Sequence, residues 1–173
     1  MRPLVLAVVA VLVLLRLVEV AYARRNAAAL LARGGRRITP DGFRGIAAVH
    51  TLWLVGMLVE EALVGPSVAF GTLRQVALGC AVASEALRLW AIATLGPRWN
   101  VHVLVLPDAP PVARGPFRFL RHPNYVAVVT QLVAIPLALG LVWTAAVVLP
   151  LKIAALVPRL RVEERALREA SGA

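Results

Sequence analysis

The sequence contains a single cysteine, Cys80, and a single lysine. One cysteine excludes a disulfide within the chain and a cysteine-rich metal site, so we expect no metal. Eighteen arginines supply the other basic charges, alongside many alanines and valines. This usage is typical of a GC-rich bacterial genome, and we therefore expect a bacterial source.

Charged residues are also scarce, because they make up 16% of the chain while hydrophobic residues make up 60%. The mean hydropathy is +0.79, and yet the formal net charge is +10. A soluble domain of 173 residues cannot bury so much apolar surface. We expect a single transmembrane domain over residues 1–173, surrounded by membrane lipids.

Several functional motifs are missing from the sequence. It has no glycine-rich loop with nucleotide-binding spacing, no Ser/His/Asp order and no internal repeat. Paired broken helices with internal symmetry, which are typical of transporters, are missing as well. Nucleic acid is not an expected partner, because the arginines flank apolar runs and the positive-inside rule accounts for them.

Five apolar segments are predicted transmembrane helices, at residues 3–23, 45–64, 71–95, 126–139 and 141–157. The first is longer than the apolar region of a signal peptide and is followed by arginines, so we interpret it as a retained helix. The last two form one apolar run of 32 residues. As a single helix this run would extend about 48 Å, beyond a bilayer core of about 30 Å. We therefore predict a short hairpin that turns near Gly140.

Arginines gather in three segments, at residues 24–44, at residues 114–121 and in the tail from Arg159 onward. Basic segments stay in the cytoplasm. Five crossings put all three on one side and leave the Glu60-Glu61 turn on the other. The predicted fold is an all-α integral membrane bundle with a cytosolic loop and a C-terminal helix. We expect it in the bacterial inner membrane with its active site facing the cytoplasm.

The most unusual stretch runs from Arg114 to Tyr125 and reads Arg-Gly-Pro-Phe-Arg-Phe-Leu-Arg-His-Pro-Asn-Tyr. Its prolines, Pro116 and Pro123, favour extended or turn backbone at the residue before each. Any one of its arginines or aromatics could be an anchor at the lipid headgroups. The whole set, at the mouth of an apolar helix, favours a functional loop.

A second unusual stretch covers residues 159–167 and reads Arg-Leu-Arg-Val-Glu-Glu-Arg-Ala-Leu. Arg159 and Glu163 are four residues apart and share a helix face. The plain alternative is an amphipathic tail lying on anionic lipid. The paired glutamates weaken such an attraction, so we favour a role that needs carboxylates.

Together, residues 114–125, the apolar hairpin and residues 159–167 resemble the isoprenylcysteine carboxyl methyltransferase family. That family in turn resembles the phospholipid methyltransferases. The resemblance covers about residues 71–168. It implies a membrane-embedded methyltransferase that uses S-adenosylmethionine without a soluble Rossmann domain, with a catalytic region over residues 96–168.

The resemblance also implies site residues, by their position in the family pattern. Cofactor contacts are expected at His102, Ala109, Pro110, Pro111, Val112, Phe117, His122, Pro123, Asn124, Tyr125 and Glu163. Arg159 is expected to bind the acceptor group of the substrate, and Arg159 and His122 are the expected catalytic residues. Phe117 stands where the family often has tyrosine, so a hydroxyl contact is lost.

The chemistry of these residue types agrees with the resemblance. Methyl transfer from a sulfonium is an in-line displacement, so a carboxylate or phenolate acceptor needs positioning and desolvation more than a strong base. Arg159 offers a permanent charge and a planar fork for a carboxylate. Glu163 or Glu164 can accept hydrogen bonds from the cofactor. His122 can donate to the cofactor or, when neutral, take a proton from a phenolic acceptor.

The methyl acceptor has several possible identities. The family name implies a prenylated cysteine carboxylate, or a similar lipophilic small molecule. A bacterial source also favours the hydroxyl of a long-chain polyketide, such as an alkylpyrone or alkylresorcinol. A phospholipid amine is disfavoured, because Arg159 would repel a cationic acceptor. In the non-enzymatic alternative, the basic loops hold a membrane-anchored protein on anionic lipid or on a partner.

Polar residues inside the predicted spans are expected to be structural. His50 is expected in the core or at the interface. Glu85 and Arg88 are three residues apart and share a helix face. Charges within a membrane usually face the interior of a bundle, so we expect these two residues to pair there.

Overall fold

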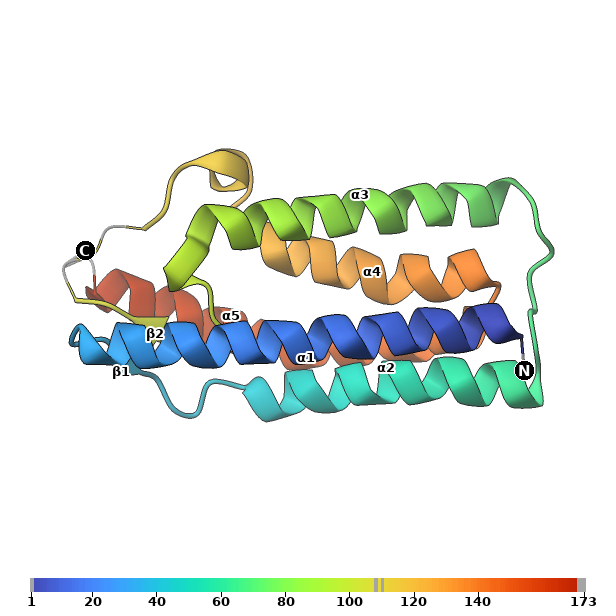
Figure 1. Cartoon of the computed structure of the whole chain (residues 1–173), viewed down its shortest axis with the longest axis horizontal. Helices are drawn as coiled ribbons and strands as arrows, with labels where there is room; N and C mark the ends of the chain where they lie inside the picture. Colours follow the sequence, from blue (N-terminus) through green and yellow to red (C-terminus); the bar gives the residue numbers. More distant parts are fainter. Residues whose placement is uncertain (1, 108, 110, 171–173) are drawn as a thin grey trace.

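The computed structural model describes residues 2–107, 109 and 111–170 of the chain. Its helices lie side by side along one long axis, as the predicted all-α bundle requires (Figure 1). The described α-helices are α1 (Pro3–Ala32), α2 (Phe43–Leu63), α3 (Thr72–Leu95), α4 (Pro123–Leu139) and α5 (Val142–Ala170).

Successive helices alternate in direction along the bundle (Figure 1). Residues 33–42, residues 96–122 and the C-terminal part of α5 therefore lie at one end, which we call the basic end. The α2–α3 connection and the turn at Gly140 lie at the opposite end, which we call the turn end. The three arginine-rich segments that were predicted to share one side thus share the basic end.

Three described helical stretches are long and apolar enough to cross a membrane. They are α1, α2 and Thr72–Arg98, in which the 3-10 helix η1 (Gly96–Arg98) continues α3. Leucines point outward from them, and Leu14 and Leu17 of α1 are 61% and 62% exposed. These stretches suggest a membrane protein. The 17-residue α4 is a shorter apolar helix, so the count of five crossings stays a prediction.

The main hydrophobic core lies between α1, α2, α4 and α5. Val5, Val9 and Leu12 recur at helical spacing and form one buried stripe on α1. They pack in one cluster with Trp53 and Met57 of α2, which are 2% and 0% exposed. α3 packs mainly against α4, outside this cluster.

Two helices extend beyond the predicted spans. The first helix continues from Ala23 to Ala32, because its arginine- and alanine-rich end still favours helix after the hydrophobic run has stopped. The fifth span and the C-terminal helix form one helix, α5, which runs through Pro150 and Pro158 to Ala170. Proline removes one backbone hydrogen bond, but the good helix formers on either side keep the helix continuous.

The predicted hairpin between the last two apolar helices is present and turns at Gly140. Gly140 ends α4 with a φ of +85°, in the left-handed region that favours glycine. The amide of Leu141 donates to the carbonyl of Pro136 at 2.8 Å, which closes the helix end. A Cβ on Gly140 would lie 3.0 Å from Cβ of Pro66, so the close approach also requires glycine.

The charged residues of the turn end bind helix termini. Glu60 of α2 accepts hydrogen bonds from the amides of Trp143 and Thr144 at 3.0 and 2.7 Å, and so caps the start of α5. Arg2 pairs with Glu61 at 2.7 Å and also donates to the carbonyl of Leu139 at the end of α4. Carboxylates at helix N-termini and guanidinium groups at C-termini match the helix dipole.

The basic end contains short elements that the sequence did not predict. Strand β1 (Arg36–Arg37) pairs antiparallel with β2 (Leu104–Val105), and a 3-10 helix, η2 (Gly115–Arg118), precedes α4. Val105 is buried against Ala166 of α5. The ladder therefore ties the segment after α1 to the segment after α3 and holds both against α5.

Candidate functional site

A cavity of about 460 Å³ extends from the basic end into the bundle. Its lining includes His122 and Glu163 near the basic end. It also includes Arg16, His50 and Lys152, which lie further along their helices toward the middle of the bundle. Small-molecule sites usually have volumes of roughly 300–1,000 Å³, so the cavity is large enough for a cofactor.

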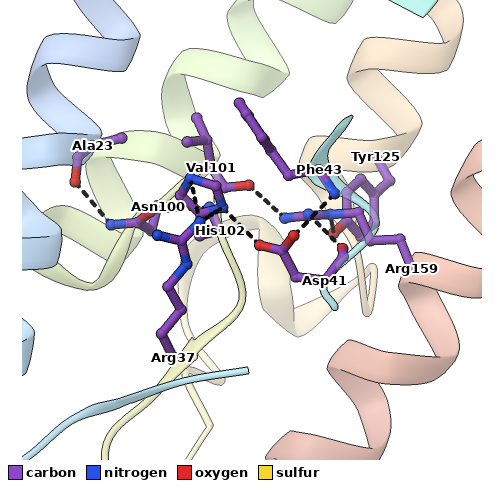
Figure 2. A network of polar contacts seen from close by, with 9 residues as sticks. All are labelled: Ala23, Arg37, Asp41, Phe43, Asn100, Val101, His102, Tyr125 and Arg159. Carbon is purple, nitrogen blue, oxygen red and sulfur yellow. Dashed lines mark hydrogen bonds and ion pairs between the residues drawn. The ribbon is translucent and has the colours of Figure 1, made fainter. Parts of the chain in front are cut away.

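Arg159 of α5 lines this cavity and is the centre of a polar network (Figure 2). Its guanidinium donates to the Tyr125 hydroxyl at 2.9 Å, to the Asp41 carbonyl at 3.0 Å and to the Val101 carbonyl at 2.7 Å. The residue is only 6% exposed. Arg159 therefore joins α4, the segment before α2 and the segment after α3.

Gly42 makes this approach of the chain segments possible. Its φ of +70° lies in the left-handed region, and it directly precedes α2. A Cβ at this position would lie 3.3 Å from Cβ of Arg159. The glycine thus lets the backbone of Asp41 reach the guanidinium.

His102 and Asp41 form the second part of the network (Figure 2). The Nδ1 atom of His102 lies 2.7 Å from Oδ2 of Asp41. One guanidinium nitrogen of Arg37 lies 2.9 Å from Nδ1 and 3.0 Å from Nε2 of the same ring. A carboxylate only accepts, so the Nδ1–H of His102 donates to Asp41.

The pKa of Asp41 is lower than its ordinary value. Burial alone would raise this pKa, but the amide of Phe43, the ring of His102 and the charge of Arg159 together outweigh the burial. The Phe43 amide donates to Oδ1 of Asp41 at 3.0 Å. Asp41 is therefore ionised at neutral pH and orients His102.

The C-terminal part of α1 holds the loop that carries His102. Asn100 donates to the carbonyl of Ala23 at 2.8 Å and accepts from the amide of His102 at 3.0 Å (Figure 2). Asn26 donates to the carbonyl of Trp99 at 2.8 Å. The continuation of α1 beyond the predicted span thus positions this loop.

His122, Tyr125, Glu163 and Glu164 form a third group, between α4 and α5. The Tyr125 hydroxyl donates to the carboxylate of Glu163, and Nε2 of His122 lies 3.2 Å from a carboxylate oxygen of Glu164. The rings of His122 and Tyr125 stack with their centroids 5.6 Å apart. The hydrogen bond to His122 lowers the pKa of Glu164, with a further contribution from Arg121.

The structure brings together the residues that the sequence singled out. The cavity is lined by His102, Ala109, Pro111, Val112, Phe117, His122, Pro123, Asn124, Tyr125, Arg159 and Glu163. Pro110 lies outside the described residues. The oxygen of the Asn124 side chain is buried and has no hydrogen-bond partner within residues 2–107, 109 and 111–170. A ligand with a donor can satisfy that oxygen.

Sequence reasoning missed Asp41, Arg37 and Asn100. The Pro-Asp-Gly sequence around Asp41 by itself indicates only a turn between helices. Local pattern carries no information about which distant segment a loop will contact. Only the meeting of residues 36–42 with residues 100–105 brings these three side chains together.

The expected pair of Glu85 and Arg88 does not form. Arg88 forms an ion pair with Glu19 of α1, and Glu85 accepts a hydrogen bond from Gln131 of α4. The shared face of α3 meets two different neighbours, so each charge finds its partner on another helix. Glu19 also pairs with Arg16, at 2.9 Å.

His50 lies on the wall of the cavity. Its Nδ1 atom is 2.8 Å from the carbonyl of Ile46, one helical turn earlier in α2. The ring also meets Trp53 edge-on, with centroids 6.5 Å apart. His50 is thus partly buried in the helical part of the bundle, as expected, and it additionally faces the cavity.

Comparison with known proteins agrees with these motifs. A family model described as the isoprenylcysteine carboxyl methyltransferase (ICMT) family matches residues 77–169. The uncharacterized protein YpbQ of Bacillus subtilis is 29% identical over 163 residues, which cover 94% of this chain and 96% of that protein. An uncharacterized protein of Haemophilus influenzae is 23% identical over 154 residues, 88% of each chain. No solved structure gives a significant match.

Proposed function

Because the chain belongs to the isoprenylcysteine carboxyl methyltransferase family, we propose that it methylates a carboxylate of a lipophilic substrate and takes the methyl group from S-adenosylmethionine. The observation that carries this proposal is the cavity at the basic end. Its lining combines Arg159, Tyr125, His122 and Glu163, which all lie within the matched residues 77–169.

The chemistry of the cavity fits this cofactor. The unpartnered oxygen of Asn124 can accept from a ribose hydroxyl or from the amino group. Tyr125 uses one carboxylate oxygen of Glu163, so the other oxygen can accept from the same groups. When bound, the cofactor supplies a methyl group on a positively charged sulfur, and in-line displacement leaves that sulfur as a neutral thioether. His102 and residues 109–112 border the same space.

Arg159 is the proposed ligand of the acceptor carboxylate. A guanidinium has five N–H groups, and three hydrogen bonds to Tyr125, Asp41 and Val101 leave others for a substrate. Those bonds also hold the side chain in one orientation, so little entropy is lost when a carboxylate binds. A carboxylate needs no base. For a phenolic acceptor, His122 would take the proton.

We further propose that all five helices cross a bacterial inner membrane and that the basic end faces the cytoplasm. The support is the common location of residues 33–42, residues 96–122 and the end of α5 (Figure 1). Positively charged segments remain on the cytoplasmic side. A lipophilic substrate would then reach the cavity from the membrane.

The first test is the binding of S-adenosylmethionine to the purified protein, measured by calorimetry in lipid-supplemented detergent. We expect saturable binding that is lost in Glu163→Ala. The matched control is Glu169→Ala, which removes an exposed carboxylate from the same helix and should bind like the wild type. Absence of binding to the folded wild type would overturn the enzyme proposal and favour a basic membrane anchor.

The acceptor is then identified by screening pairs of lipophilic acids and long-chain phenols for transfer of a labelled methyl group. We expect the acids to be methylated and Arg159→Lys to lose most of that activity, because lysine cannot grip a carboxylate with two parallel bonds. If only phenols are methylated, the acceptor is a hydroxyl of the polyketide type and not a carboxylate. His122 is then the residue that takes the proton from that hydroxyl.

A further inference from the structure

Lys152 is the most deeply buried of the charged residues that the structure describes, with 1% of its surface exposed. It lies on α5 two turns before Arg159, so the two side chains share a helix face. It also lines the cavity. Among the described residues, none forms a hydrogen bond or an ion pair with its ammonium group.

The charges around Lys152 do not compensate it. The charged groups that act on it most strongly are Arg159 and Arg16, which are both cations. Its own charge acts in turn on His50, on the facing wall of the cavity. Glu19 is a carboxylate of the cavity wall, and it is already shared between Arg16 and Arg88.

Other donors at this depth are also unused. Nε of Arg16 and both Nε and Nη1 of Arg88 are buried and have no hydrogen-bond partner in the described part of the chain. Both side chains line the cavity. Buried cations and buried donors normally have partners, because leaving them unpaired costs free energy. This wall of the cavity is therefore complementary to an anionic oxygen.

We propose that Lys152 and the adjoining cavity wall form a binding subsite for an anionic oxygen of a lipophilic substrate, such as a carboxylate or a phenolate. The proposal rests on the proposed function, because it names the class of substrate that the same cavity takes. Arg159 borders this subsite on the side of the basic end, and His50 borders it on α2. The apolar chain of the substrate would lie toward the membrane.

The subsite also gives Lys152 a role that Arg159 does not have. Most strong donors of Arg159 are directed to Tyr125, Asp41 and Val101, so Arg159 is partly a structural residue. The ammonium group of Lys152 keeps all three of its donors for a ligand. Selection of an acid over its neutral ester should therefore depend more on Lys152 than on Arg159.

The test compares two anionic probes, palmitate and N-acetyl-S-farnesylcysteine, with their methyl esters. Calorimetric titrations use the full chain in detergent, in the presence and absence of S-adenosylhomocysteine. We expect each acid to bind the wild type at least about tenfold more tightly than its ester. Lys152→Met should lose this preference and keep its affinity for S-adenosylmethionine. The control Arg25→Met, which removes an exposed cation from α1, should keep both.

Stability without a ligand provides a second measurement. An unpaired buried cation opposes folding, so Lys152→Met should unfold at a higher temperature than the wild type. A lower unfolding temperature, or a failure to fold, would show that Lys152 is a structural residue and would overturn the subsite.

Equal affinities of the wild type for an acid and for its methyl ester would also overturn the proposed subsite. Both results are independent of whether S-adenosylmethionine binds, so this proposal and the proposed function can fail separately.

Discussion

The two ends of the bundle use the same kinds of charged residue in different ways. At the turn end, Glu60 caps α5, Arg2 pairs with Glu61, and Arg74 donates to the carbonyl of Ala138 at 2.9 Å. Each of these groups satisfies a helix terminus or an opposite charge. In the cavity that extends from the basic end, the side-chain oxygen of Asn124 has no described hydrogen-bond partner, and Lys152 lines the wall deeper in the bundle.

The difference separates stabilising charges from ligand-binding charges. A buried polar group that has all its partners contributes to the fold, and its removal leaves other groups without partners. A buried polar group that lacks a partner beside a cavity is costly to the fold and is retained where a ligand completes it. Position in the sequence does not distinguish the two kinds, because whether a polar group finds a partner depends on its neighbours in space.

Arg159→Ala is expected to have the largest effect, because Arg159 both holds segments of the fold together and is the proposed ligand of the acceptor carboxylate. The change leaves the carbonyls of Asp41 and Val101 without their donor, and we expect a loss of about 4 kcal/mol of stability. Cofactor binding should be lost as well, since the segments around Asp41 and His102 are released. Thermal unfolding in detergent measures the first effect and calorimetry the second.

The matched control is Arg161→Ala, an exposed arginine on the same helix. Wild-type stability of Arg159→Ala would mean that Arg159 serves the ligand alone.

Glu60→Ala should have the next largest effect, and only on stability. Two amides at the start of α5 and the hydroxyl of Thr144 lose their acceptor, which we expect to cost about 3 kcal/mol. The affinity for S-adenosylmethionine, measured on the folded fraction, should not change. A weaker affinity would show that the turn end is coupled to the cavity, and it would contradict the division of roles between the two ends.

Asp41→Asn should weaken cofactor binding by about tenfold. The Phe43 amide and the His102 ring donate to different oxygens of Asp41, and asparagine replaces one of these oxygens with an NH2 group that cannot accept. His102 then loses its fixed orientation. Calorimetry with S-adenosylmethionine measures the change. An unchanged affinity would show that His102 does not contact the cofactor.

The pH dependence of stability should report Asp41 directly. Folding lowers the pKa of Asp41 below its ordinary value of about 3.9. The carboxylate therefore contributes its full stabilisation above that pH, and the contribution is lost as the pH falls through the folded-state pKa. The stability difference between the wild type and Asp41→Asn should be constant from about pH 5 to 7 and shrink below about pH 4. A constant difference at all pH values would contradict the lowered pKa of Asp41.

Glu164→Gln should have the smallest effect. The side chain of Glu164 is 29% exposed, and ion pairs of this kind contribute little because water screens them. We expect the affinity for S-adenosylmethionine to change by less than about twofold. A large loss of affinity would mean that Glu164, and not Glu163, contacts the cofactor.

Local sequence pattern predicted much of the fold and of the site. Hydrophobic runs located the helices α1 to α4, and Gly140 marked the turn of the hairpin. The segments 114–125 and 159–167 pointed to the family, and the family model matches residues 77–169. These features depend on residue spacing within one segment, which is visible in the sequence.

The partners of each charge depend on packing between helices instead. Arg88 pairs with Glu19 and not with Glu85, because α3 lies against α1 and α4 at different points of its face. Asp41 and His102 are 61 residues apart and meet through the ladder of β1 and β2. No local pattern encodes such a meeting.

Spans, hairpin and family motifs thus follow from hydrophobicity and spacing along the chain. The cavity, the orientation of Arg159 and the isolation of Lys152 follow from how the five helices pack, because burial and pairing are properties of neighbours in space. A lysine in an apolar run is only a composition anomaly in the sequence. In the bundle it becomes a cation without a partner, beside a cavity that a substrate can fill.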